Sequence, residues 1–143
     1  MSWEREVEEI RRRERLAREM GGEESVARHR AAGKLDVRAR IAALLDAGSF
    51  HETGALAGRA VYDADGRIES FRPSNFVFGT GLVDGRKIVV GGDDFTVRGG
   101  AQDGAVGNKM GYAEKMAREM LLPLVRLVDG TGGGGSVKTL ERI

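Results

Sequence analysis

Apolar residues recur at helical spacing through the first third of the chain, and this pattern predicts three helices. Residues 2–20 carry one apolar stripe, flanked by acidic and basic residues four positions apart, and the stripe consists of Trp3, Val7, Ile10 and Ala17. A second helix is expected over residues 23–32, because glycines lie on both sides of it. Asp36 is a fair N-cap for a third helix, which ends at the turn of residues 46–49.

The pattern changes to short β-rich runs after Phe50. Residues 76–83 and 87–90 are two such runs, and Asp84-Gly85 near their junction is the signal of a two-residue hairpin turn. Residues 94–97 predict another short strand. Residues 55–75 contain turn formers without a clear period, so we expect an irregular connection there.

Helical spacing returns over residues 103–120, where the methionines are most simply explained as core residues. The apolar run 121–128 then predicts a buried strand, and residues 130–135 form a glycine-rich loop that precedes a possible helix start at residues 136–143. A helix that leads into a buried strand is typical of α/β layering. Because so few strands are predicted, we expect the chain to be a fragment of a larger domain.

The composition narrows the chemistry that the chain can perform. It has 143 residues, of which 41% are hydrophobic and 31% charged, no apolar run long enough to cross a bilayer, and a net charge of +1. These values favour a cytoplasmic protein with no membrane or nucleic-acid partner. The chain has no cysteine, so disulfides, thiolate nucleophiles and cysteine metal sites are excluded.

The 22 glycines are the unusual feature; they are concentrated after Gly79 and include two clusters. Arg98-Gly99-Gly100-Ala101 and residues 130–135 each lie between an apolar run and a predicted helix start. Glycine there lets the backbone turn its N–H groups toward a phosphate or an oxyanion, aided by the positive end of the next helix. A flexible loop without a ligand is the alternative for either cluster taken alone.

Nucleotide binding is a second interpretation of the same loop. Gly130, Gly132 and Gly135 satisfy the G-x-G-x-x-G spacing of dinucleotide-binding loops, although the acidic residue expected about 20 positions later has no counterpart. A Walker loop is disfavoured, because Ser136-Val137 follows where lysine and a hydroxyl residue are required.

The remaining polar candidates have simpler structural explanations. His29 and His51 are far apart in sequence and lack the spacing of a metal site, so a surface or structural role is favoured and no metal is predicted. Asp93-Asp94 is more typical of a turn or a backbone cap than of a catalytic acid pair. Lys109 and Lys115 could meet an anionic ligand, but lysine on a helix is usually solvated.

Several motifs, in order along the chain, resemble the carboxyltransferase subunits of biotin-dependent acyl-CoA carboxylases, the propionyl-CoA, methylcrotonyl-CoA and acetyl-CoA carboxylase type. The residues that carry the resemblance are His29–Ile41, Leu44–Glu52, Gly79-Thr80-Gly81, Asp93–Ala101, Lys109 and Leu127-Val128-Asp129. The second glycine loop differs from the family pattern Asp-Ser-Gly-Gly-Ala-Arg, because Asp129 is followed by Gly130-Thr131 and the usual arginine is absent.

The resemblance implies a partial crotonase-like spiral of β-β-α units, with a helical segment over residues 1–48 and the incomplete domain over residues 49–143. Such enzymes move a carboxyl group from carboxybiotin, held by a biotin carboxylase or biotin carrier partner, to an acyl-CoA. By this resemblance, the backbone amides of Gly132 and Gly133 would stabilise the oxyanion, and the acyl-CoA would contact Arg98, Gly99, Gly100, Ala101 and Lys109. Oligomers of carboxyltransferase subunits are also implied.

Two other functions stay open on the sequence alone, namely a nucleotide-binding α/β domain and a non-catalytic assembly domain. If the carboxyltransferase interpretation is correct, the isolated chain should bind acyl-CoA without turnover, because the family carries the carboxybiotin side on a second domain.

Overall fold

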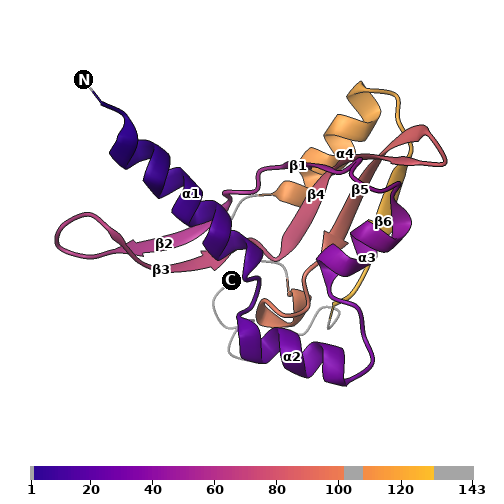
Figure 1. Cartoon of the computed structure of the whole chain (residues 1–143). Coiled ribbons are helices and arrows are strands. Elements are labelled where there is room, and N and C mark those ends of the chain that lie inside the picture. Colours follow the sequence, from indigo (N-terminus) through magenta and orange to yellow (C-terminus); the bar gives the residue numbers. More distant parts are fainter. Residues whose placement is uncertain (1, 102–107, 131–143) are drawn as a thin grey trace, which may run out of the picture.

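The chain forms helices first and strands afterwards, with one more helix and one more strand near its end (Figure 1). The computed structural model describes residues 2–101 and 108–130. The helices are α1 (Glu4–Arg18), α2 (Glu23–Ala31), α3 (Val37–Leu44), the short 3-10 turn η1 (Arg98–Gly100) and α4 (Lys109–Glu119). The strands are β1 (His51–Thr53), β2 (Gly58–Tyr62), β3 (Ile68–Pro73), β4 (Phe76–Val83), β5 (Arg86–Asp93) and β6 (Leu124–Leu127).

The described residues form a four-stranded sheet in the order β1-β4-β5-β6. Strands β1, β4 and β5 are antiparallel neighbours, whereas β6 runs parallel to β5 and pairs Val90 with Val125. A parallel pair needs a crossover connection, and α4 supplies it. The β4-β5-α4 succession is therefore the β-β-α unit that the sequence led us to expect, and the fold is α/β.

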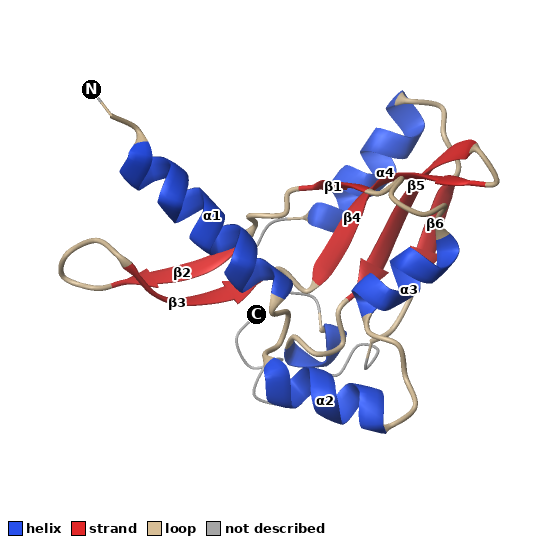
Figure 2. Ribbon diagram, viewed as in Figure 1, coloured by secondary structure: helices blue, strands red, loops and turns tan. Residues whose placement is uncertain are grey.

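Helices cover both faces of this sheet (Figure 2). On one face, Val77, Ile88 and Val90 pack against the α3 side chains Val37 and Ile41. On the other face, the apolar side chains of α4 and the sheet form a second cluster that contains Phe76, Phe78, Val89, Ala113 and Ala117. Neighbouring strand residues thus point to opposite layers, which explains why β4 and β5 read as continuous apolar runs.

The β4–β5 hairpin confirms the turn predicted from Asp84-Gly85. Both residues have left-handed backbone angles, with φ of 49° and 74°, as a two-residue turn between right-twisted strands requires. The Asp46 carboxylate, at the end of α3, accepts hydrogen bonds from both turn amides at 3.0 and 2.8 Å. The hairpin tip is therefore fastened to the helical layer.

The connection over residues 55–75 is more regular than the sequence indicated. Strands β2 and β3 form a separate antiparallel ribbon, and α1 packs along β3 (Figure 1). The prediction of an irregular segment was wrong, because side chains along this thin ribbon do not alternate cleanly between core and solvent. Within the predicted stripe of α1 only Ala17 is buried, while Trp3, Val7 and Ile10 are exposed.

Two other expectations need correction. Residues 94–97 form a turn instead of a strand. Helix α4 begins at Lys109, with Asn108 as its N-cap; residues 102–107, where the predicted helix began, lie outside the described part. The methionine prediction holds for Met110 and Met116, which pack on the second cluster, but Met120 is exposed.

Candidate functional site

The first glycine cluster folds into a tight left-handed turn, separated from the end of β5 by residues 94–97. Arg98, Gly99 and Gly100 have φ angles of 54°, 62° and 69°, so three consecutive residues occupy a region that side chains disfavour. The turn is closed by its own backbone: Gly100 N–H donates to the Val97 carbonyl at 3.1 Å, and Ala101 N–H donates to the Arg98 carbonyl at 3.2 Å. These two amides therefore hold the shape of the turn.

This turn packs against the start of the second glycine cluster. A β-carbon built on Gly100 would lie 2.5 Å from the Asp129 carbonyl oxygen and 3.1 Å from Gly130 Cα. No side chain fits in that space, so glycine at position 100 permits the close approach of the two backbone segments. Gly132 and Gly133 lie outside the described residues, but the segment that leads to them begins beside the first turn.

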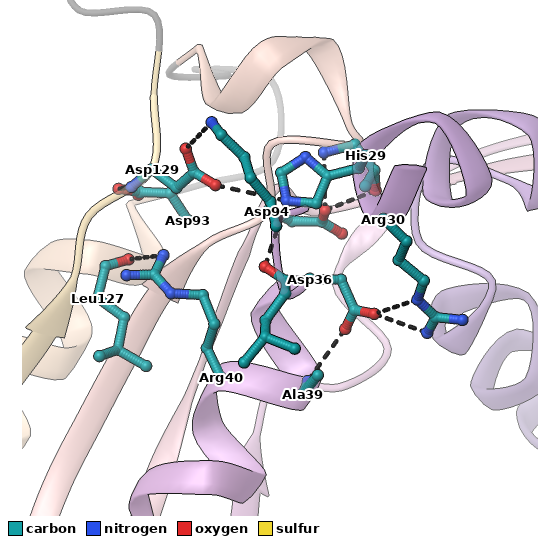
Figure 3. Close-up of polar contacts among 12 residues, drawn as sticks. His29, Arg30, Asp36, Ala39, Arg40, Asp93, Asp94, Leu127 and Asp129 are labelled. Carbon is teal, nitrogen blue, oxygen red and sulfur yellow. Dashed lines mark hydrogen bonds and ion pairs between the residues drawn. The ribbon is translucent and has the colours of Figure 1, made fainter. Parts of the chain in front are cut away.

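Asp129 is held from two sides at this point (Figure 3). Its carboxylate lies 3.5 Å from His29 Nε2 and 3.3 Å from Lys34 Nζ. The His29 ring stacks on Phe95 with a centroid separation of 5.5 Å, and the Lys34 ammonium lies 4.8 Å from the same aromatic ring. His29 is buried and also contacts the Leu35 carbonyl at 3.2 Å, which agrees with the structural role favoured from the sequence.

The adjacent Asp93 and Asp94 carboxylates accept hydrogen bonds from separate backbone groups and do not form an acid pair with each other. Asp94 is 1% exposed and accepts hydrogen bonds from Thr96 N–H and Thr96 Oγ1 at 3.0 and 2.6 Å. Burial raises the pKa of Asp94, and the hydrogen bonds from Thr96 oppose this rise. Asp93 accepts from Asp129 N–H at 3.3 Å and lies 3.6 Å from the Arg126 guanidinium. The turn-capping interpretation is therefore confirmed.

Asp36 orients the helix that lies beside this site. It caps α3 by accepting from Ala39 N–H at 3.0 Å, and it accepts two hydrogen bonds from Arg30 at 3.0 and 2.7 Å (Figure 3). Burial alone raises the pKa of Asp36, but these hydrogen bonds outweigh it and hold the pKa below its ordinary value. Farther along α3, Arg40 donates to the Leu127 carbonyl at 3.4 Å, so the helix also contacts the end of β6.

Lys109 is buried, although lysine on a helix is usually solvated. Only 7% of it is exposed; its Nζ donates to the Gly54 carbonyl at 3.1 Å and lies 5.7 Å from the centre of the Phe78 ring. Burial lowers the pKa of Lys109 to about 8, against a smaller opposing effect of Glu52. Glu52 itself is engaged by Arg38 at 2.8 and 3.1 Å.

The structure thus places the proposed binding residues in two groups. Arg98, Gly99, Gly100 and Ala101 form one turn beside Asp129, whereas Lys109 opens α4 beside the connection between β1 and β2. Their binding roles stay predictions. Thr96 carries no sequence signal that would select it. Its hydroxyl accepts a hydrogen bond from Gly21 N–H at 2.9 Å and so links the α1–α2 corner to the glycine turn.

The described residues provide neither a cluster of metal-binding side chains nor a membrane-spanning helix. Within residues 2–101 and 108–130, no group of three or more histidine, cysteine or carboxylate residues is arranged to hold a metal ion. Over the same ranges, none of the helices combines the length and apolar character that crossing a bilayer requires.

Comparison with known proteins places the chain in a family. The model of the carboxyl transferase domain matches residues 28–141. A curated Drosophila melanogaster protein named probable methylcrotonoyl-CoA carboxylase beta chain is 39% identical over 113 residues, which are 78% of this chain and 19% of that protein. The propionyl-CoA carboxylase beta chain of Saccharopolyspora erythraea is 36% identical over 126 residues, which are 87% of this chain and 23% of that protein.

Solved structures agree with this placement. A transcarboxylase 12S structure, described as a hexamer with methylmalonyl-coenzyme A bound, superposes with a TM-score of 0.78 at 25% identity, and the match covers 99% of this chain and 28% of that chain. The match to the Pseudomonas aeruginosa geranyl-CoA carboxylase beta subunit covers 84% of this chain and 22% of that chain, with a TM-score of 0.61 at 25% identity. The expected crotonase-like fold is thereby confirmed. The chain spans about a fifth of the length of the curated relatives that it matches. It belongs to the family of carboxyl transferase domains.

Proposed function

We propose that this chain forms the acyl-CoA side of a biotin-dependent acyl-CoA carboxyltransferase. One observation carries the proposal: the Arg98–Gly100 turn touches the backbone of Asp129 and Gly130, so that the two glycine segments start from one place. Two functionally unrelated loops would not be expected to pack against each other in this way. The membership of the chain in the carboxyl transferase domain family supports the same assignment.

The chemistry explains why backbone amides suit this reaction. The α-carbon of the acyl group must lose a proton and then form a bond to the carboxyl carbon, and between these events negative charge lies on the thioester oxygen. The bond between that carboxyl carbon and the biotin nitrogen would break in the transfer, and the freed biotin nitrogen would take up the proton. Fixed N–H donors stabilise such charge because they need no reorientation during the reaction. Carboxybiotin, carried by a partner protein, would supply the carboxyl group as a co-substrate. We assign none of the described residues to it.

Within this proposal the two glycine segments have different tasks. Gly132 and Gly133 would donate their N–H groups to the thioester oxygen. The Arg98–Ala101 turn would position that segment and contact the acyl-CoA, because its Gly100 and Ala101 amides are already used within the turn. The contact of Asp129 with His29 and its ion pair with Lys34 would fix the approach of the second segment.

The proposed partners follow from the same assignment. They are a biotin carboxylase or biotin carrier protein and further copies of the carboxyltransferase subunit, and the proposed location is the cytoplasm. The transcarboxylase 12S structure is described as a hexamer, which supports an oligomer for this protein as well.

Gly100→Ala tests the contact between the segments, and Gly85→Ala is its matched control. Both glycines have positive φ, at 69° and 74°, so both variants carry the same backbone strain of roughly 1–2 kcal/mol. Only at Gly100 does the added methyl group meet backbone, whereas nothing lies within 4 Å at Gly85. By calorimetric titration with acetyl-CoA, we expect Gly100→Ala to lose at least tenfold in affinity and Gly85→Ala to keep the parent value.

Equal affinities of the two folded variants would contradict this assignment. Titration of the unmodified chain with NAD and ATP separates the nucleotide-binding alternative, and the absence of binding to any of these ligands would favour an assembly domain. With a biotin carboxylase and a biotinylated carrier added, we expect the chain to bind acyl-CoA without forming malonyl- or methylmalonyl-CoA.

A further inference from the structure

Helix α1 and the β2–β3 ribbon project together from one side of the sheet (Figure 1). Polar side chains join them, and the Arg5 guanidinium donates to the Asp65 carbonyl at 3.3 Å. Arg13 donates to the Tyr62 hydroxyl and lies 5.9 Å from the centre of the Phe71 ring. The cleft between helix and ribbon has a volume of about 630 Å³, and most of the side chains that line it are charged. The side of α1 that faces its own chain is therefore mainly polar.

The apolar stripe of α1 points the other way. Trp3, Val7 and Ile10 are 67%, 41% and 47% exposed, and within the described chain they belong to neither core cluster. Glu9, which accepts from the Tyr62 hydroxyl at 3.5 Å, lies two positions after Val7. Because two positions along a helix turn through about 200°, the stripe and the contacts with the ribbon lie on nearly opposite sides of α1. A contiguous row of exposed apolar side chains, unlike single scattered ones, indicates an interaction site.

The charges of α1 are divided between its two halves. Residues 4–9 contain four glutamates and one arginine, whereas residues 11–18 contain five arginines and one glutamate. A second α1 that runs antiparallel is complementary to this pattern, because each acidic half meets a basic half, and a parallel one would bring like charges together. An anionic membrane is a poorer match, since helices that lie on membranes carry mostly lysine and arginine on their polar face. The charge pattern therefore favours a second copy of the same helix.

We propose that two copies of this chain pair through antiparallel α1 helices, across the stripe of Trp3, Val7 and Ile10. Val7 of one copy lies against Ile10 of the other. Glu4 and Arg11 are seven positions apart and so lie on the same flank of the stripe. A twofold axis brings this flank of one helix beside the same flank of the other, which places Glu4 of each copy near Arg11 of the other. Both side chains are exposed, and neither forms an ion pair with another described residue.

This pairing gives the subunit association of the proposed function a definite surface. The contact itself rests on α1 alone and needs no bound acyl-CoA. Its seam is shorter than a standard interface of roughly 800 Å² per partner, so we expect a dissociation constant on the order of 10–100 µM.

Sedimentation equilibrium and tryptophan fluorescence of the whole chain, across a concentration series, test the pairing. Trp3 is the sole tryptophan, so the emission reports directly on the proposed surface. We expect a monomer–dimer equilibrium, and we expect the emission maximum to move to shorter wavelength as the dimer forms and covers the indole ring.

Exchange of the flanking charges tests the orientation. Glu4→Arg and Arg11→Glu each place like charges opposite one another, so each variant alone should dimerise about tenfold more weakly than the parent. In an equimolar mixture of the two variants every such contact joins opposite charges, and dimerisation should return to within about threefold of the parent value. Arg12→Glu makes the same change of charge on the side of α1 that faces the ribbon, and it should leave the dissociation constant nearly unchanged.

A parent chain that stays monomeric at every concentration would overturn the pairing, and so would single variants that dimerise as well as the parent. Failure of the mixture to dimerise would overturn the antiparallel arrangement. A monomeric parent that binds phosphatidylglycerol vesicles with a shift of the Trp3 emission would assign the stripe to a membrane instead. None of these results changes the acetyl-CoA titration of Gly100→Ala, so the pairing and the carboxyltransferase assignment can fail separately.

Discussion

At the scale of single residues, Lys109 shows what a sequence pattern does not reveal. The sequence places it within a predicted helix, over residues 103–120, and allows a contact with an anionic ligand. That its side chain would be buried against Gly54 and Phe78 was not visible, because burial depends on which distant segment covers the helix. Asp94 is a similar case, since its turn-forming character was expected but its partner Thr96 was not.

The lowered pKa of Lys109 predicts an unusual dependence of stability on pH. The unfolded chain keeps the proton up to the ordinary value of 10.5, whereas the folded chain loses it near pH 8. Between these values the unfolded state binds more protons, so the free energy of unfolding should rise with pH. Burying the charged Lys109 ammonium costs roughly 3 kcal/mol of stability, and this cost disappears as the pH rises from about 8 to 10.5.

Urea denaturation of the parent and of Lys109→Met, at pH 7 and pH 10, measures this contribution. The variant should be more stable at pH 7, and its advantage should shrink at pH 10. Lys115→Met removes an exposed lysine on the same helix and should leave the pH dependence unchanged. The expectation would be contradicted if the difference in the free energy of unfolding between the parent and Lys109→Met were the same at pH 7 and pH 10.

At the scale of the elements, local signals succeeded where they were chemically specific. Asp84-Gly85 identified its hairpin because few other residue pairs adopt the required backbone angles, and Asp36 identified the start of α3 because its carboxylate accepts from a helix amide. The strand prediction for residues 94–97 was wrong, although the residue types favour a strand. The Asp94 carboxylate accepts a hydrogen bond from Thr96 N–H, and this local bond stabilises a turn instead.

Asp36 allows the capping contribution to be separated from the ion pair with Arg30. Asp36→Asn keeps an oxygen for Ala39 N–H, so it should cost less than Asp36→Ala, which loses the cap and about 1 kcal/mol with it. The folded pKa of Asp36 is below its ordinary value of 3.8, so the charge of Asp36 stabilises the fold above that pH.

Chemical denaturation at pH 7 and in acid checks both statements. The difference between the parent and Asp36→Asn should diminish as the pH falls below the ordinary aspartate value, whereas the penalty of Asp36→Ala should persist in part. Equal stability of the Asn and Ala variants at pH 7 would show that the helix cap contributes nothing.

At the scale of the whole molecule, the family resemblance predicted the β-β-α unit and the region of the glycine turns, but not how distant segments meet. The approach of Gly100 to Asp129, the packing of α1 on β3 and the contact of Lys109 with Gly54 each join parts of the chain that share no local pattern. Such contacts follow from the completed fold, so a pattern confined to a short window cannot report them.

The α1–α2 corner offers a test of this long-range packing. A β-carbon on Gly21 would lie 1.9 Å from the Thr96 carbonyl oxygen, which is a backbone atom and cannot turn aside as the end of a flexible side chain can. Gly21→Ala should therefore destabilise the fold by roughly 3 kcal/mol. The neighbouring Gly22→Ala adds only the strain of a positive φ, because nothing lies within 4 Å of its new atom.

Thermal and urea unfolding of the two variants would compare them directly. The Gly21 substitution should lower the midpoint clearly more than the Gly22 substitution. If the Gly22 variant proved as unstable as the Gly21 variant, the corner would not be the close contact that the structure describes.

The ion pair between Lys34 and Asp129 also bears on the order of folding. These residues are 95 positions apart, so the contact closes a loop that includes most of the chain. Closing so long a loop costs conformational entropy, and other contacts must offset this cost before the ion pair can stabilise the fold. We therefore expect the pair to form late in folding. During synthesis on the ribosome, α2 and α3 emerge long before β6. The contacts that join Asp129 to Lys34 and to the first glycine turn could therefore form only after β6 has emerged.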